Sequence, residues 1–87
     1  MYFVVAYDIT QDRRRARVMS ALKNFGRRVQ FSVFECDLDA ARMAELRKSL
    51  EGLIDPRRDK VHIYPLCGSC FFRAERLGVE DRRGMDL

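Results

Sequence analysis

The stretch Phe3-Val4-Val5-Ala6-Tyr7-Asp8 decides the fold, because its run of β-branched and aromatic residues stops at a single acid. Such a run predicts a buried strand over residues 2–9, with both faces covered. An arginine-rich segment, residues 13–17, follows almost at once. Carboxylate oxygens suit hard divalent cations, and guanidinium groups match the geometry of phosphate. This order of residues therefore makes nucleic acid the first candidate for a binding partner.

A helix is predicted directly after this strand. Thr10 or Asp12 can cap it, and apolar residues then recur at helical spacing until Gly26 supplies the stop. Arg13, Arg14 and Arg17 fall on the face away from this apolar stripe. The stripe consists of Val18, Ala21, Leu22 and Phe25. The helix is therefore expected to turn an apolar face to the core and a basic face to solvent.

Strand and helix patterns alternate along the rest of the chain. Residues 28–38 alternate with period two, which is typical of extended structure but long for one strand. A second helix follows Asp39 and closes at Pro56, and residues 61–66 form another strand. Residues 73–77 are one more short candidate. If residues 28–38 fold as a hairpin, this order is the split βαβ of a ferredoxin-like α+β sandwich.

The charge distribution narrows the class of partner. The 87 residues make one small domain, of a size that often gains stability by oligomerising. The first 30 residues hold seven basic residues against two acids, whereas the other 57 hold ten against eleven. Excess positive charge in one third of the chain predicts a surface that faces a polyanion. No segment resembles a signal peptide or a membrane span, so we expect a cytoplasmic protein with no membrane partner.

Four segments of the chain form a recognisable set of motifs. They are Val5-Ala6-Tyr7-Asp8-Ile9, Arg14-Arg15-Ala16-Arg17-Val18, residues 26–35 and residues 59–66. Together, in this order and spacing, they resemble the small CRISPR-associated adaptation protein, a ferredoxin-like partner of the CRISPR integrase that is described as a nuclease. The resemblance covers the chain from Met1 to Gly78.

The resemblance implies a ferredoxin-like βαββαβ sandwich with a hairpin around Ser32. It also implies a symmetric homodimer and an additional C-terminal strand that pairs with the partner subunit. We therefore expect a single domain over residues 1–78, which includes this strand near residues 73–77. A polar tail is expected over residues 79–87.

Asp8 is the residue to which the resemblance assigns metal binding, and with it catalysis. Magnesium usually takes one or two protein carboxylates and keeps several waters. Two Asp8 side chains that face each other across a two-fold axis could share one Mg²⁺ ion, with Mn²⁺ as the alternative. Such an ion would lower the pKa of a bound water and neutralise charge on the scissile phosphate. The structural alternative is that this acid is a helix cap or turn former.

Arginine side chains are the candidates for nucleic-acid binding. Arginines that neutralise several backbone phosphates give an affinity for nucleic acid that depends on salt and has little sequence preference. For each arginine the alternative is a solvated helix face. The candidates are Arg14, Arg15, Arg17, Arg27 and Arg28.

Three other side chains are candidates for a wall of the site. Tyr7 and Phe34 could stack on it or line it, although aromatic residues on strands more often pack in the core. Ser32 could contact phosphate or simply turn the hairpin.

The three cysteines, Cys36, Cys67 and Cys70, are expected to be free thiols. With His62 they could complete a zinc set of three cysteines and one histidine. A single C-x₂-C pair is weak evidence for a zinc site or for a redox role, so ordinary thiols are the preferred interpretation.

Two functions of different class fit these patterns. As an enzyme, the protein would be a metal-dependent endonuclease that cuts phosphodiester bonds of RNA or DNA at Asp8. As a scaffold, it would be a non-catalytic dimeric adaptor that bridges CRISPR integrase subunits and grips the incoming duplex. The resemblance implies a role in the integration of new spacers, with double-stranded DNA as a partner and single-stranded RNA as a further candidate.

Overall fold

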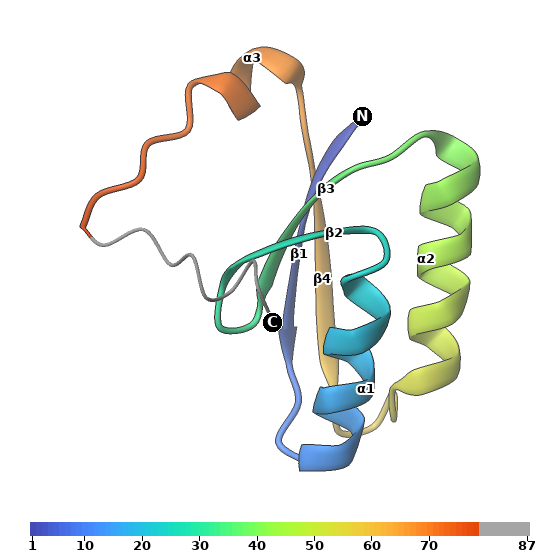
Figure 1. The fold of residues 1–87 in the computed structure, drawn as a ribbon. Coiled ribbons are helices and arrows are strands. Elements are labelled where there is room, and N and C mark those ends of the chain that lie inside the picture. The colour runs from blue at the N-terminus through green and yellow to red at the C-terminus, as the bar shows by residue number, and fades with distance from the viewer. Residues whose placement is uncertain (79–87) are drawn as a thin grey trace.

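Strand β1, Tyr2–Asp8, forms from the opening apolar run and lies inside the sheet between two other strands. In the computed structural model, which describes residues 1–78, the sheet is antiparallel and has the order β2-β3-β1-β4 (Figure 1). The other strands are β2, Gly26–Gln30, β3, Val33–Asp37, and β4, Lys60–Leu66. The two longer helices are α1, Asp12–Leu22, and α2, Ala40–Leu53. The predicted ferredoxin-like α+β order βαββαβ is therefore confirmed.

The extended region between the two helices is a hairpin rather than one long strand. β2 ends at Gln30, β3 begins at Val33, and Phe31 and Ser32 form the turn between them. The register of the two strands shifts between Arg28 and Gln30, so β2 carries an irregularity just before the turn. The hairpin that the resemblance implied around Ser32 is confirmed.

Both longer helices begin at a side-chain cap. Asp39 directly precedes α2, as predicted, and its side chain accepts a hydrogen bond of 2.8 Å from a backbone N–H of the first turn. The cap predicted for α1 is wrong. Gln11, rather than Thr10 or Asp12, accepts the bond from the backbone N–H of Arg14, at 2.7 Å. Asp12 instead lies in the first turn, where a negative charge favours the helix N-terminus.

Gly26 does not end α1, so that prediction is also wrong. The helix ends at Leu22, with Lys23 as its cap, and Gly26 is the first residue of β2. A Cβ atom at this position would lie 2.3 Å from the backbone oxygen of Glu35 and 2.5 Å from the sulfur of Cys36. Glycine is therefore required here by the close approach of β2 to β3 rather than by a turn.

The core lies between the sheet and the helices α1 and α2, which cover one of its faces (Figure 1). Alternate residues of β1, namely Phe3, Val5 and Tyr7, point into this core and are buried. The helices add residues at helical spacing, which are Val18, Leu22, Met43, Leu46 and Leu50. No helix within residues 1–78 has the length and apolar character that crossing a membrane requires.

The other face of β1 is only partly covered. Tyr2, Val4 and Ala6 alternate with the core residues and are half-buried. The expectation that both faces of this strand are covered is therefore wrong within this chain, because the two longer helices, α1 and α2, lie on one side only. We call the uncovered surface the open face of the sheet. It is defined by Val4, Ala6, Asp8, Val33, Glu35, His62 and Tyr64, which lie on one side of the sheet by alternation and register.

The C-terminal part of the domain differs most from the prediction. A short helix that was not predicted, α3, Gly68–Phe72, follows β4, and residues 73–77 form no strand within this chain. Phe71 stacks on Tyr2 with 4.1 Å between ring centroids. The strand near residues 73–77 was predicted to pair with a second subunit, so it stays a prediction. The predicted polar tail over residues 79–87 lies outside the described residues.

Candidate functional site

Asp8 is the last residue of β1, and the alternation of the strand places it on the open face with Val4 and Ala6. Its side chain is exposed. Lys60, the first residue of β4, lies opposite Asp8 in the register of the two strands. The carboxylate therefore lies at one end of an uncovered sheet face, where a cation or a second molecule can reach it.

The open face beside Asp8 carries apolar residues on β1 and both polar and apolar residues on the neighbouring strands β3 and β4. Two rows of residues in register cross it, Val33 with Ala6 and His62, and Glu35 with Val4 and Tyr64. Tyr64 is 51% exposed, and its hydroxyl oxygen lies 3.0 Å from Nδ1 of His62. A sheet face that neither α1 nor α2 covers, with an exposed aromatic residue on it, is typical of an interaction surface.

Arg14 lies mostly inside the protein, so the expectation that it lies on the exposed face of α1 is wrong. Its Nε and one terminal nitrogen donate to the two carboxylate oxygens of Asp59, at 2.7 and 3.1 Å. The Asp59 side chain is fully buried and also accepts from the backbone N–H of Asp55 at 2.8 Å. The hydrogen bond from Arg14 is the main cause that lowers the pKa of Asp59, and it raises the pKa of Arg14 in turn. Arg14 therefore neutralises a buried acid.

Arg15 and Arg28 also contact other parts of the chain. Arg15 donates to the backbone oxygens of residues 9–10, at 3.1 and 3.3 Å, and forms an ion pair with Asp12. These contacts brace the connection between β1 and α1. Arg28 points to the helix side of the sheet, where a terminal nitrogen lies 3.0 Å from the sulfur of Met19. Its Nε is buried and has no hydrogen-bond partner within residues 1–78.

Arg17 and Arg27 are exposed and form no ion pair with another described residue. Arg17 lies on α1. Arg27 lies opposite Glu35 in the register of β2 and β3, which places it on the side of the open face. The five candidate arginines are therefore not gathered into one track on a single chain.

Tyr7 and Phe34 belong to the core. They are 5% and 0% exposed, and their ring centroids lie 6.4 Å apart. Burial raises the pKa of Tyr7. Both point to the helix side of the sheet, opposite to Asp8, so the structure favours packing over a role as site wall. Ser32 lies in the hairpin turn, and its backbone oxygen accepts a hydrogen bond of 3.0 Å from the backbone N–H of Tyr7.

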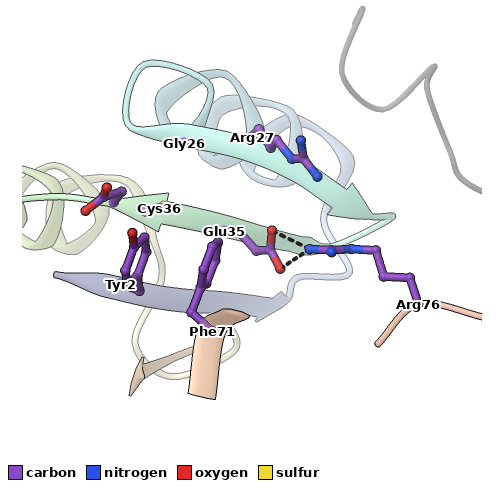
Figure 2. A pocket seen from close by; sticks show the side chains of 8 residues that line it. Tyr2, Gly26, Arg27, Glu35, Cys36, Phe71 and Arg76 are labelled. Carbon is purple, nitrogen blue, oxygen red and sulfur yellow. Dashed lines mark hydrogen bonds and ion pairs between the residues drawn. The ribbon is translucent and has the colours of Figure 1, made fainter. Parts of the chain in front are cut away.

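A hollow of about 440 Å³ lies between the sheet and the residues that follow α3 (Figure 2). Tyr2 and Phe71 line it with their stacked rings. Arg76 donates to both carboxylate oxygens of Glu35, at 2.6 and 2.7 Å, and this ion pair holds the C-terminal segment against β3 (Figure 2). The segment therefore reaches over the β3 part of the open face, whereas Tyr64 on β4 remains exposed.

No three side chains of histidine, cysteine, aspartate or glutamate gather within residues 1–78 as a metal site would require. The cysteines are separated, because Cys36 is buried and Cys67 and Cys70 are exposed at the start of α3. The described residues thus do not bring the three cysteines and His62 into one zinc site. At Asp8, one chain offers a single carboxylate.

The family follows from comparison with known proteins. A family model described as CRISPR associated protein Cas2 matches residues 1–74. The chain belongs to the Cas2 family. One Cas2 relative, from Chloroflexus aurantiacus, is named CRISPR-associated endoribonuclease Cas2 1 and is 42% identical over 79 residues, 90% of this chain and 85% of its own. A second, CRISPR-associated endonuclease Cas2 2 from Thermus thermophilus, is 44% identical over 77 residues, 88% of this chain and 81% of its own.

Solved structures share the fold, and one of them is named as a Cas2 protein. The crystal structure of Streptococcus pyogenes Cas2 at pH 6.5 matches with a TM-score of 0.81 at 31% identity, over 90% of this chain and all of that one. A hypothetical protein from Thermus thermophilus matches with a TM-score of 0.83 at 43% identity, over 91% of this chain and 92% of that one. The Cas2 resemblance drawn from four sequence motifs is thereby confirmed.

Sequence reasoning missed two acids, each of which binds an arginine from a distant part of this Cas2-family chain. Asp59 lies directly before an apolar strand, which was a signal for a buried acid that needs a cation. Glu35 lies inside an apolar strand, which was a similar signal. Their partners, Arg14 and Arg76, lie 45 and 41 residues away in sequence, so no local pattern connects them.

Proposed function

We propose that this Cas2-family protein is a homodimeric, Mg²⁺-dependent endonuclease that binds nucleic acid and supports the integration of new CRISPR spacers together with the integrase. One observation carries the proposal, namely the exposed carboxylate of Asp8 at the end of an open sheet face. The names of two relatives, endoribonuclease and endonuclease, support cleavage of phosphodiester bonds.

The occupant that we propose for the open face is a second copy of the chain. A symmetric contact between two such faces would cover Val4, Ala6 and Tyr64, which the helices leave uncovered. It would also let the two Asp8 carboxylates approach each other across the two-fold axis. In this dimer residues 73–77 leave the contact with Glu35 and pair as a strand with the partner subunit.

Val4→Lys is expected to weaken this dimer by at least about 100-fold in Kd, because like charges that meet across an interface cost several kcal/mol. Val4 lies on the open face, so the monomer is expected to remain folded. Sedimentation equilibrium measures the change. Ala44→Lys adds the same charge on the exposed side of α2 and is the matched control. If both variants raise the Kd of the dimer equally, or if neither raises it, the proposed interface is contradicted.

The cation that we propose is Mg²⁺, with Mn²⁺ as a substitute, held between the Asp8 carboxylates of the two subunits. Two carboxylates with several waters are a normal ligand set for this ion. When bound, it would supply an acidified water and positive charge beside the scissile phosphate. Asp8 itself has the role of ligand, and Lys60, opposite it in the register, adds a positive charge near the phosphate.

Phosphate contacts are assigned here to Arg17 and Arg27, because both are exposed and neither forms an ion pair with another described residue. Arg14 is engaged by a buried acid, and Arg15 by the connection before α1. Doubled by a two-fold axis, the two exposed arginines give four positive charges to one dimer.

Replacing Arg17 and Arg27 together with alanine is expected to weaken the binding of every duplex tested. The slope of log K against log salt should fall by about 0.9 for each phosphate that the variant no longer neutralises. Fluorescence anisotropy with a labelled duplex at several salt concentrations measures both quantities. The double variant Arg47→Ala, Lys48→Ala removes the same charge from the exposed side of α2 and is the control. An unchanged slope would show that the two arginines are only solvated surface.

A cleavage assay tests the proposed function as a whole. Labelled RNA and duplex DNA are incubated with the protein in Mg²⁺, in Mn²⁺ and in EDTA. We expect cleavage in either metal and none in EDTA. Duplex binding without cleavage in any metal would contradict the nuclease and leave the non-catalytic adaptor of integrase subunits.

A further inference from the structure

The segment Cys67-Gly68-Ser69-Cys70 is a feature that the proposed function does not use. β4 ends at Leu66, and Cys67 is the cap of the short helix α3. Both of these cysteines are exposed, whereas Cys36 is buried. The chain therefore carries two accessible thiols three positions apart and one buried thiol that serves as an internal reference.

The cap geometry turns the side chain of Cys67 toward Cys70. Cys67 has extended backbone angles, φ −72° and ψ 158°, and the chain turns into α3 directly after it. The sulfur of Cys67 accepts a hydrogen bond from the backbone N–H of Cys70 at 3.3 Å and lies 3.3 Å from the hydroxyl oxygen of Ser69. A disulfide requires Cα atoms about 4.4–6.8 Å apart and side chains that point together, which one helical turn can supply. The sulfur of Cys67 therefore lies against the backbone of Cys70, at a sequence spacing that a disulfide can bridge.

We propose that Cys67 and Cys70 are a reversible dithiol–disulfide site, which exchanges with small-molecule disulfides of the glutathione class. The site lies at the junction between the sheet and residues 73–77, and neighbouring Phe71 packs on Tyr2. It involves neither Asp8 nor the open face, so the proposal stands independently of the nuclease function.

The two thiols differ in acidity in the direction that this exchange requires. Hydrogen bonds from Ser69, and then from Cys70, lower the pKa of Cys67 to about 7. The pKa of Cys70 is raised, because its thiol hydrogen-bonds to the sulfur of Cys67. Cys67 is therefore the attacking thiolate near neutral pH, and Cys70 is the thiol that resolves the mixed disulfide. Burial raises the pKa of Cys36 to about 11, which keeps that thiol unreactive.

The reaction proceeds by two thiol–disulfide exchanges. The Cys67 thiolate attacks one sulfur of oxidised glutathione, the glutathione S–S bond breaks, and one glutathione thiolate leaves. Cys70 then loses its proton to solvent, and its thiolate attacks the Cys67 sulfur. The Cys67–Cys70 bond forms as the second glutathione thiolate leaves. Two cysteine thiols are oxidised, and one small-molecule disulfide is reduced to two thiols.

The test equilibrates the full chain in mixtures of reduced and oxidised glutathione, traps free thiols with iodoacetamide and maps the products by mass spectrometry. We expect a Cys67–Cys70 disulfide that forms in oxidising mixtures and disappears in reducing ones, while Cys36 stays reduced. The proposal is overturned if both thiols stay reduced in oxidised glutathione alone. It is also overturned if the wild-type chain stops at a glutathione adduct.

Two single variants separate the roles of the thiols. Cys70→Ser should accumulate the glutathione adduct on Cys67, because no resolving thiol remains. At pH 7, Cys67→Ser should react with oxidised glutathione at Cys70 more than about fivefold more slowly than Cys70→Ser reacts at Cys67. The low-pKa thiol of Cys67 has the larger thiolate fraction, and its lower nucleophilicity offsets only part of this advantage. Serine is also a good helix cap, so this variant keeps α3. Equal rates in the two variants would overturn the assignment of Cys67 as the nucleophile.

Discussion

Asp8→Asn is expected to reduce metal-dependent cleavage by at least about 100-fold, since even the loss of a group that only supports a metal ligand costs about 10–100-fold. Asparagine keeps the shape of the side chain but removes the charge that holds the cation, and a dimer loses both charges at once. Asp8 is exposed and lies at a strand end, so the fold should be unaffected. Cleavage rates of labelled RNA and duplex DNA against Mg²⁺ concentration, with Tm measured alongside, provide the check.

The matched control for this variant is Asp12→Asn. Asp12 is another exposed acid near the end of β1, but it pairs with Arg15 and lies in the first turn of α1. We expect the Asp12→Asn variant to keep the cleavage activity of the wild type. Cleavage that survives Asp8→Asn would point to a different site, and equal loss in both variants would assign the effect to general charge rather than to a metal ligand.

Arg14→Ala is expected to lower the Tm at pH 7 by at least about 5 °C, because it leaves a buried acid without its cation. The Asp59 side chain is 0% exposed, and Arg14 binds it through two hydrogen bonds. Thermal unfolding followed by circular dichroism measures the loss. Arg17→Ala removes an exposed arginine of the same helix and is the control, for which we expect little change in Tm.

The contribution of this ion pair should depend on pH in a defined direction. Arg14 lowers the pKa of Asp59 below its usual value of 3.8, so the stabilisation is complete above that pH. It is lost as pH falls through the lower pKa of the folded state. The difference in Tm between the wild type and Arg14→Ala should therefore be full at pH 7 and shrink below about pH 4. A difference that does not change with pH would show that Arg14 acts through packing alone.

The order of the elements could be predicted because each depends on a local pattern. The apolar run before Asp8 and the helical spacing after Asp39 each specify their element without reference to distant residues. The hairpin was different, since its turn, Phe31-Ser32, contains none of the glycine, proline or asparagine residues that usually mark one. Periodicity alone could not divide residues 28–38, and the family resemblance supplied the division.

The candidate site was predictable only where it depends on one strand. Asp8 stood out as the acid that ends an apolar run, and the family resemblance assigned metal binding to it. The structure places it exposed at the end of β1, and its role as a metal ligand stays a prediction. The sequence could not show which arginines are exposed and which bind acids of the same chain. A buried pair such as Arg14 with Asp59 joins positions 45 residues apart. The strand predicted at residues 73–77 needs a second subunit, so no pattern within one chain can establish it.

The place of β1 inside the sheet has a consequence for how the chain is made. β1 is synthesised first, but its two neighbours are β3 and β4, and the second of these begins only at Lys60. Contacts between such distant segments form slowly, because the loop between them must first be closed. Until β4 arrives, one edge of an apolar strand stays unpaired, which is the template on which chains aggregate. Nascent chains that end before Lys60 are thus the vulnerable species, and protection by chaperones matters most before β4 leaves the ribosome.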